Sequence, residues 1–419
     1  MRPYFVGQEV ASCPLNRARM PGLRAVGWGR RRLHPLCGSA LALLAVAYLL
    51  SLPGCLRDGS TQPRGELTPR QSPVSVREIW RWSAPRQGSG PLPLSFLDMP
   101  LATDEVVLVG LMAKPRLACA IDAETGRTLW ERPASLFAVA GSRAVILHDY
   151  RLECVTARDS KVLWAIDLSG SPNRGWYQLS IAGERIILAS RAQTMCFDLR
   201  TGKRLWTYNE QGSYEKDGRV AVASSRGMVI VTHYRDGRLI AAVNAADGTK
   251  AWRYEPSSLI PFAPPWVTED LVLVRTELGV EALESATGKV RWRTRQSLPR
   301  FGGVGVAMVG SSVYSVSGDL LRELNPTDGS VSRQRTLPEP LYGIPGATMA
   351  DARGLLAIVG MRSRGEKKIQ AGVVLFDPAA GEIVLSDYPF SRTVTGQLAG
   401  AGDRLFFIGF DAVAAFEIR

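Results

Sequence analysis

Histidine, cysteine and carboxylate side chains are the groups that could perform catalysis or bind a metal ion in this chain of 419 residues. His148 and His233 each lie after an apolar stretch, and neither has a second ligand at metal-binding spacing nearby. Asp217, Asp236 and Asp351 could each act as a base, but no spacing singles them out and no catalytic triad can be assembled. The sequence therefore predicts neither a catalytic site nor a metal site.

The N-terminal segment has the layout of a secretory signal. Consecutive arginines at residues 30–32 precede an almost uninterrupted apolar run over residues 40–52. The uncharged stretch over residues 35–54 is only just long enough to cross a bilayer, which needs about 20 apolar residues, and it contains Pro35 and Pro53. We therefore expect residues 1–54 to be a cleaved signal rather than a permanent anchor.

The end of this segment, Leu52, Pro53, Gly54 and Cys55, resembles a bacterial lipobox. Leu three positions before the cysteine and Gly directly before it suit the processing peptidase, whereas Pro is unusual in the middle position. The resemblance implies an exported protein anchored through a lipid on Cys55 at an extracytoplasmic or periplasmic membrane face, with residues 55–74 as a flexible linker. An uncleaved signal anchor and cleavage without lipidation are the alternatives.

The net charge of +12 is unevenly distributed along the chain. Residues 1–54 contain seven arginines and one glutamate and contribute +6, which leaves a mild +6 for the remaining 365 residues. No dense cluster of Lys and Arg with interleaved aromatic residues occurs in that part. Charge patterning therefore argues against a nucleic-acid partner.

One unit recurs from residue 75 onward: an alternating apolar strand, a short hairpin, a second strand ending in an acidic or amide residue, then a Gly and a Trp. Repeats of about 40–50 residues are typical of propellers and solenoids. The clear copies cover residues 120–130, 196–206, 242–252 and 282–292, and weaker ones cover 154–164, 323–333 and 375–385. The repeated positions are Asp122, Gly126, Trp130, Trp164, Asp198, Gly202, Trp206, Asn244, Gly248, Trp252, Gly288 and Trp292.

Each residue type in this motif has a structural role. The Gly stands where a tight hairpin turn needs a positive φ. The Asp or Asn, eight residues before the Trp, can accept hydrogen bonds from amides of that turn. The Trp lies on the outermost strand, where it can fill the wedge between neighbouring blades and bury about 150–250 Å². The motif therefore predicts packing rather than chemistry.

The two ends of the repeat region complement each other. Residues 77–82, with Trp80 in the motif frame, resemble an outer strand alone, whereas residues 404–409 and 413–417 supply two middle strands without an outer one. An N-terminal strand that joins the C-terminal blade closes the ring without a free edge. The sequence thus predicts an all-β, eight-bladed propeller of four-stranded antiparallel blades over residues 75–419. The middle strands give the same count, at residues 106–109, 144–147, 185–188, 228–231, 271–274, 313–316, 355–359 and 405–408.

The pattern Ala-x-Asp-x-x-Thr-Gly-x-x-x-Trp, seen at residues 120–130 and in variants at 196–206 and 242–252, resembles the pyrroloquinoline-quinone-like (PQQ-like) repeat. Two branches of that superfamily are eight-bladed. The quinoprotein alcohol dehydrogenases imply PQQ, calcium, an aspartate base and an adjacent cysteine pair, and this sequence contains no Cys-Cys. The propeller lipoprotein of the outer-membrane β-barrel assembly machinery implies a lipobox followed by one propeller, which is the plan of this chain.

Three cysteines remain in the propeller region: Cys119, Cys154 and Cys196. Cys154 and Cys196 occupy the strand position that Ala120 and Ala242 hold in sister repeats. We therefore interpret them as small apolar core residues. A disulfide or a metal role is the alternative, although three cysteines cannot all pair.

Unusual loops are the best sequence clue to a binding surface, because loops tolerate variation that strands do not. They cover residues 170–177, 208–218, 255–266 and 361–368. The alternative is that these loops merely cover the blade tops. Aromatic and Arg residues suit protein contacts, and the candidate interaction face consists of Trp176, Tyr177, Tyr214, Phe262, Trp266, Arg362, Arg364 and Lys367.

The sequence favours a non-enzymatic, monomeric, exported propeller that acts as a protein-binding scaffold for envelope proteins and needs no cofactor. A PQQ-dependent dehydrogenase or a degenerate relative, with PQQ and calcium, is the enzyme alternative. A third possibility is a module that binds carbohydrate or peptide in the envelope. Architecture is specified far more strongly than activity.

Overall fold

The computed structural model describes the chain from residue 75 to residue 419, except for residues 88–89, 92–93, 95–100, 171–175, 191–192, 210–218, 226, 235–238, 259–264, 296–304, 342–348, 353, 364–368, 392–396 and 410. The expected signal over residues 1–54, the Cys55 lipid site and the linker lie outside the described residues. So do Asp217, Asp236, Tyr214, Phe262, Arg364 and Lys367.

All regular structure in the described residues is β-strand, and the strands form eight blades that follow one another along the chain. Blades 1 to 4 consist of β4 (Leu101–Ala102), β5 (Val106–Leu111), β6 (Leu117–Asp122) and β7 (Thr128–Pro133); β8 (Leu136–Ala140), β9 (Arg143–His148), β10 (Arg151–Thr156) and β11 (Val162–Asp167); β12 (Trp176–Ala182), β13 (Arg185–Ser190), β14 (Gln193–Asp198) and β15 (Arg204–Asn209); and β16 (Arg219–Ser225), β17 (Met228–Tyr234), β18 (Leu239–Asn244) and β19 (Lys250–Tyr254).

The second half of the chain repeats this arrangement. Blades 5 to 8 consist of β20 (Trp266–Val267), β21 (Leu271–Thr276), β22 (Gly279–Glu284) and β23 (Val290–Arg293); β24 (Gly305–Val309), β25 (Ser312–Leu324) and β26 (Val331–Leu341); β27 (Met349–Ala352), β28 (Leu355–Ser363), β29 (Ile369–Asp377) and β30 (Glu382–Ser391); and β31 (Gln397–Ala401), β32 (Arg404–Ile408), β33 (Ala412–Ile418) and β1 (Val76–Ser83). A small hairpin of β2 (Arg86–Gln87) and β3 (Gly90–Pro91) follows β1.

In blade 6, β25 occupies both middle positions. Residues 312–316 pair with β24, whereas Gly318 and the residues up to Leu324 pair with β26. Gly318 has a φ of 63° and stands between the two halves, where the backbone must reverse. Each blade therefore provides four antiparallel strand positions, and the predicted eight-bladed fold is confirmed. Every predicted middle strand falls within an observed strand.

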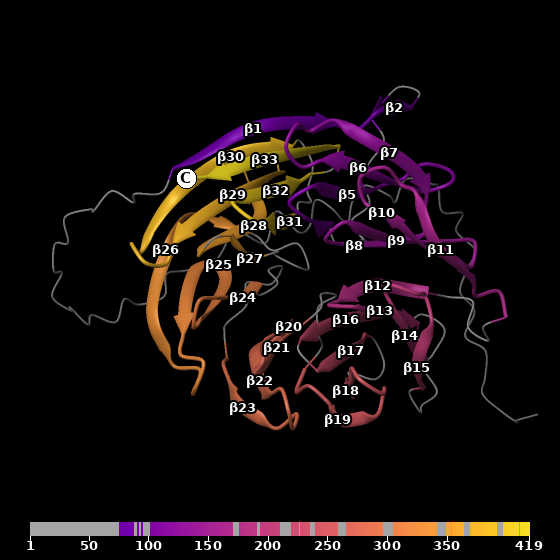
Figure 1. Cartoon of the computed structure of the whole chain (residues 1–419). Helices are drawn as coiled ribbons and strands as arrows, with labels where there is room; N and C mark the ends of the chain where they lie inside the picture. The colour runs from indigo at the N-terminus through magenta and orange to yellow at the C-terminus, as the bar shows by residue number, and fades with distance from the viewer. Residues whose placement is uncertain are drawn as a thin grey trace, which may run out of the picture. The chain divides into compact units, whose positions relative to one another are not determined.

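The N-terminal strand closes the ring as predicted. β1 pairs antiparallel with β33, with Val76 opposite Ile418 and Trp82 opposite Val413. Figure 1 shows the indigo β1 beside the yellow β33, with the first strands of the blades nearest the centre of the ring and the last strands at its periphery. This pairing covers the edge of β33 that the C-terminal blade would otherwise leave open.

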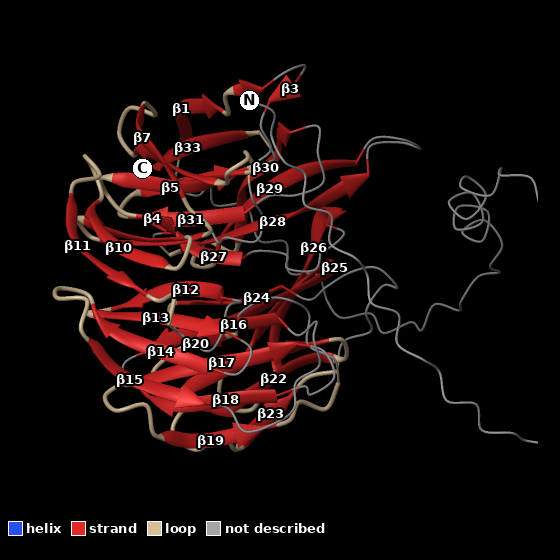
Figure 2. Cartoon of the chain, turned by 90° about the vertical axis from the view of Figure 1, so that its right-hand side faces the viewer, coloured by secondary structure: helices blue, strands red, loops and turns tan. Residues whose placement is uncertain are grey.

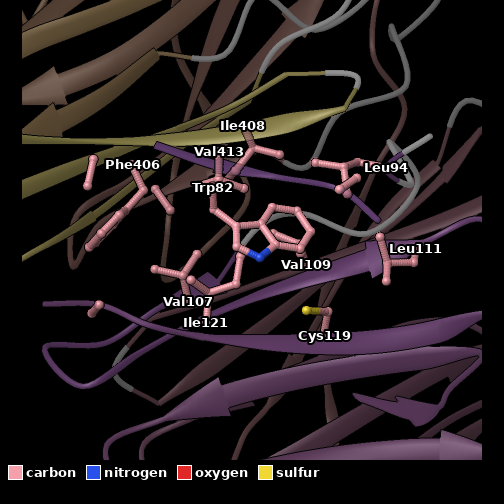
Figure 3. Packing of buried hydrophobic residues seen from close by; sticks show 14 residues of the cluster. Trp82, Leu94, Val107, Val109, Leu111, Cys119, Ile121, Phe406, Ile408 and Val413 are labelled. Atoms are coloured by element: carbon pink, nitrogen blue, oxygen red, sulfur yellow. The ribbon is translucent and has the colours of Figure 1, made fainter. Parts of the chain in front are cut away.

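Eight hydrophobic clusters lie between neighbouring blades, one at each junction around the ring. The alternation of side chains along a strand explains this arrangement. In β5, Val107 and Val109 belong to the cluster shared with blade 8, whereas Val106 and Leu108 belong to the cluster shared with blade 2. Because both faces of a middle strand are covered, most residues of these strands are apolar. Figure 3 shows the junction of blades 8 and 1, with Trp82 among Val107, Val109, Ile121 and Val413.

The blades present two different faces. In blade 1, the amide of Ala123 after the third strand donates to the carbonyl of Glu105 before the second, so the first and third hairpins lie at the same end. We call this end, with its short hairpins, the turn face. The opposite end carries the hairpin between the two middle strands and the connections between blades, and we call it the loop face. Figure 2 shows the short tan turns of β10–β11 and β14–β15 together on one side. The described residues contain no helix that could span a membrane.

Candidate functional site

The repeat motif builds the turn face. In blade 3, Oδ1 of Asp198 accepts hydrogen bonds from the amide of Thr201 at 2.7 Å and from its hydroxyl at 2.6 Å. These bonds, the hydroxyl first, lower the pKa of Asp198, so the carboxylate stays ionised. Gly202, with a φ of 72°, then turns the chain into β15. Asp122, Asn244, Asn325 and Asp377 stand at the same position in other blades, and their side-chain oxygens also accept amide hydrogen bonds.

Each motif tryptophan joins its blade to the next one. The indole of Trp206 donates to the carbonyl of Ala245 in blade 4 at 2.9 Å, and its ring lies against Gly248. The acceptor is always the residue after the Asp or Asn position of the next blade. The other pairs are Trp80 with Ala123, Trp130 with Ala157, Trp164 with Leu199, Trp252 with Ser285 and Trp292 with Pro326.

The junction of blades 6 and 7 lacks this anchor, because Arg333 stands where the Trp is expected. There the guanidinium of Arg335 lies beside Gly381, and Leu321 and Leu337 pack into the shared cluster with Leu356. The guanidinium of Arg335 therefore lies over Gly381 where an indole lies over the corresponding glycine in junctions such as that of Trp206 and Gly248.

The described residues of the candidate interaction face lie at the loop-face ends of three strands. Trp176 and Tyr177 begin β12, Trp266 begins β20, and Arg362 lies one residue before the end of β28. The side chain of Trp266 is half-buried and packs against the clusters at both junctions of blade 6, so it supports the core as well as the rim of this face.

A buried carboxylate near the loop face went unnoticed in the sequence. Glu281 in β22 is almost fully buried and accepts a hydrogen bond of 2.5 Å from the hydroxyl of Tyr254 in the outer strand of blade 4. It also accepts from the hydroxyl of Ser257 in the connection between the blades and pairs with Arg293 at 3.3 Å. Burial, and next the hydrogen bond to Glu281, raise the pKa of Tyr254 to about 12. The network fixes the start of the connection between blades 4 and 5.

Blades 1 and 2 contain a related clasp. Arg132 donates to Glu153 at 2.7 Å, and Arg151 donates to the same carboxylate at 2.6 Å. Arg132 and Tyr254 both stand two residues after a motif Trp, and Glu153 and Glu281 both stand one residue before the Cys or Ala position. Comparing these two positions in successive repeats would have revealed the pairing.

The three propeller cysteines are free and buried. Burial raises the pKa of Cys119 to about 12, that of Cys154 to about 11 and that of Cys196 to about 12. Thiols that stay protonated are poor nucleophiles and poor metal ligands. The interpretation of Cys154 and Cys196 as apolar core residues is confirmed, because each belongs to a junction cluster, and Cys119 belongs to one as well.

The remaining titratable candidates do not assemble into a reactive centre within the described part of the chain. Nε2 of His148 lies 3.1 Å from a carboxylate oxygen of its neighbour Asp149. His148 lies on β9 in blade 2, whereas His233 lies on β17 in blade 4 and Asp351 on β27 in blade 7. No three His, Cys, Asp or Glu side chains are grouped so that they could hold a metal ion among the residues described.

Comparison with known protein families identifies the family of this propeller. The model of a family described as outer membrane protein assembly factor BamB matches residues 73–218 and 191–407, which together span nearly the whole ring. The chain belongs to the BamB family. The comparison with curated protein sequences finds no match.

Two solved structures show the same fold. BamB from Moraxella catarrhalis is 15% identical with a TM-score of 0.51, and the match covers 82% of this chain and 97% of that one. The computationally designed Ika8 protein is 13% identical with a TM-score of 0.57, and the match covers 81% of this chain and 99% of that one. At such identities the structures support the architecture alone, so the role must be argued from family membership and from this chain's own residues.

Proposed function

We propose that this chain is an exported, lipid-anchored scaffold of the cell envelope that serves outer membrane protein assembly. The observation that carries the proposal is the BamB family match over residues 73–407, because it covers the propeller and not merely one repeat. The upstream Leu52, Pro53, Gly54 and Cys55 supply the lipid attachment site. The propeller contributes a rigid support, since every blade junction is closed by its own apolar cluster.

We assign the protein contacts to the loop face. The turn face is built from short hairpins whose Asp or Asn side chains accept hydrogen bonds within the turn, as the bonds of Asp198 show. The loop face carries the long connections and the strand ends at Trp176, Trp266 and Arg362. Aromatic and Arg side chains at a rim are the residue types that contribute most to protein interfaces. A partner that binds there contacts several blades at once.

The described side chains favour this role over catalysis. The buried thiols stay protonated, and the carboxylates of Glu153 and Glu281 are engaged in clasps between blades. We propose that the protein works without a resident quinone or calcium ion, because the cysteine pair that the dehydrogenase branch implies is missing from the sequence.

Site-specific photo-cross-linking tests the contact face. A photoreactive residue replaces Trp176, Tyr177 or Arg362 at the loop-face strand ends, and Thr249 or Lys289 on the turn face serves as the matched control. We expect loop-face positions to cross-link to envelope proteins of the assembly machinery and the controls to give none. Cross-links from the controls alone would contradict the assignment. The intact mass of the purified protein, compared with a Cys55→Ala form, tests lipidation separately.

A further inference from the structure

Three exposed apolar side chains lie near the turn-face ends of the outer strands of blades 2 and 3. Val162 and Leu163 in β11 are each 45% exposed, and Leu205 in β15 is 43% exposed. They make up half of the large hydrophobic residues that are exposed in the described part of the chain. The two strands belong to adjoining blades, and Trp164 joins these blades through its hydrogen bond of 3.0 Å to the carbonyl of Leu199. We call these three side chains the rim patch.

Cations lie next to the rim patch in the sequence. The hairpins that lead into β11 and β15, together with Arg204 at the start of β15, carry five cations and two carboxylates, Asp159 and Asp198, which gives a net charge of +3. Arg158 pairs with Asp122 of blade 1 at 3.0 Å. At the other turns of the same blades, Arg143 and Arg185 begin β9 and β13 and Glu184 precedes Arg185, which adds a further net charge of +1. Of the five cations at the two hairpins, those that form no ion pair within the described residues are Lys161, Arg200, Lys203 and Arg204, and all four are exposed.

The carboxylates do not neutralise this charge. Hydrogen bonds from Thr201 lower the pKa of Asp198, and the hydroxyl of Thr156 lowers that of Asp159. Both carboxylates are therefore ionised, and their negative charges are already included in the net charge of +3. The corresponding hairpin of blade 7, on another side of the ring, contains Asp377 and Glu382 and no cation. Positive charge beside exposed leucines is thus a local property of blades 2 and 3.

The chain enters the propeller on the same face. Ser75 exchanges two backbone hydrogen bonds of 2.9 Å with Arg419, so β1 begins at the turn face, where β33 ends. Trp80 then contacts the carbonyl of Ala123 in the first motif hairpin. The 20 residues from Cys55 to residue 74 span at most about 70 Å when extended. A lipid on Cys55 would therefore tether the propeller to a membrane through a linker of at most this length, which joins the propeller at the turn face.

We propose that the rim patch and its cations rest on an anionic lipid headgroup layer and orient the turn face towards the membrane. The orientation, but not the lipid contact, rests on the proposed lipid anchor. Leucine and valine side chains insert shallowly into the boundary between headgroups and acyl chains, while Lys and Arg neutralise lipid phosphates. The loop face then points away from this membrane and is available to protein partners.

Vesicle co-sedimentation tests the lipid contact without the anchor. The protein is the chain from residue 55 to residue 419 with Cys55→Ala, which retains all described strands and the compact unit Pro69–Arg419. The probes are vesicles of phosphatidylglycerol and phosphatidylcholine in equal parts, and vesicles of phosphatidylcholine alone. We expect binding to the anionic vesicles only, with a decrease as salt rises. Absence of binding to the anionic vesicles, or equal binding to both, would overturn the proposal.

Substitutions locate the contact. Lys161→Gln with Lys203→Gln should weaken binding about thirtyfold, because each cation near such a surface contributes about a factor of five. Leu163→Ser with Leu205→Ser should weaken it about tenfold or more. Val331→Ser is the matched control, since Val331 holds the position of Val162 in blade 6 and is 51% exposed. All these side chains are exposed, so thermal unfolding should not change.

The outcomes separate this proposal from others. Patch variants that bind the vesicles as well as the parent chain overturn it. Variants that keep vesicle binding but lose an acidic protein partner would assign the patch to protein binding instead. Failure of lipidation or of loop-face cross-linking would refute the proposed function and leave the vesicle result standing, because the vesicle assay contains neither a lipid anchor nor a partner protein.

Discussion

The ring of Trp206 lies directly on Gly248 of the next blade, so closely that a Cβ on that glycine would come within 2.7 Å of the ring atoms. Gly248 also has a φ of 74°. We predict that Gly248→Ala lowers the free energy of unfolding by about 2–4 kcal/mol, since both the backbone conformation and the contact oppose a methyl group. Chemical denaturation measures this change.

Gly183→Ala is the matched control for that prediction. Gly183 has a similar φ of 57°, but no atom lies within 4 Å of a Cβ built there. Its substitution should cost only about 1 kcal/mol, from the backbone alone. Equal losses for the two variants would show that the Trp contact does not restrict position 248.

Tyr254→Phe tests the clasp between blades 4 and 5. The substitution removes the hydroxyl that donates to the buried Glu281, and we expect a loss of about 1.5–3 kcal/mol in the free energy of unfolding, as for hydrogen bonds to charged groups. Tyr150→Phe is the control, because that ring packs against the cluster of blades 2 and 3 without a hydrogen bond of its hydroxyl in the described structure. An unchanged stability of Tyr254→Phe would mean that Glu281 is satisfied without the tyrosine.

The buried thiols predict a pH dependence of stability. Their pKa values are raised from 9.0 to about 11–12 in the folded protein, so above pH 9 the unfolded chain has lost protons that the folded chain keeps. Stability should therefore be complete below pH 9 and decrease as the pH rises above it. Denaturation between pH 8 and pH 10, where Tyr254 still contributes little, measures the slope.

A variant with Cys119→Ala, Cys154→Ala and Cys196→Ala serves as the control for this dependence. Alanine occupies the positions of Cys154 and Cys196 in sister repeats, so the fold should tolerate it. We expect the slope to flatten in the variant. Rapid modification of the native thiols by a disulfide reagent at pH 8 would contradict their burial.

Thr232 and Thr276 provide a paired test of buried hydroxyls on the loop-face ends of the middle strands. The hydroxyl of Thr232 has no hydrogen-bond partner within the described residues, whereas that of Thr276 donates to the carbonyl of Gly279 at 3.2 Å and accepts from the amide of Leu278. We expect Thr232→Val to leave stability unchanged or raise it by about 1 kcal/mol, and Thr276→Val to lower it by about 1–2 kcal/mol. Thermal unfolding of both variants measures these changes in stability. A larger loss of stability for Thr232→Val than for Thr276→Val would refute the assignment of their hydrogen bonds.

The architecture was predictable because one local motif repeats. Asp198, Gly202 and Trp206 each satisfy a constraint within a single hairpin or between adjacent blades. The isolated strand at Trp80 predicted that the N-terminal segment completes the C-terminal blade and closes the ring. The clasp of Tyr254 and Glu281 was not predicted, because it joins positions of two successive repeats whose register is visible only once the blades are placed.

The candidate face was less predictable than the fold. Its residues were chosen from loop length and residue type, which do not fix side-chain packing. Trp266 illustrates the difference, since it begins β20 at the loop face yet packs against two core clusters. The rim patch was missed because Leu163 and Leu205 precede motif tryptophans and resemble core residues in the sequence, whereas only the placed strands show them exposed.

Co-purification from membranes tests the central claim most directly. Tagged full-length protein and its Cys55→Ala form are isolated from detergent-solubilised membranes, and the bound proteins are identified by mass spectrometry while ultraviolet-visible absorbance monitors quinone. We predict that the lipidated protein brings with it an outer-membrane β-barrel assembly protein, that the Cys55→Ala form recovers less of it, and that no quinone absorbance appears. A soluble protein that carries quinone and no assembly partner would contradict the scaffold role and favour the dehydrogenase alternative.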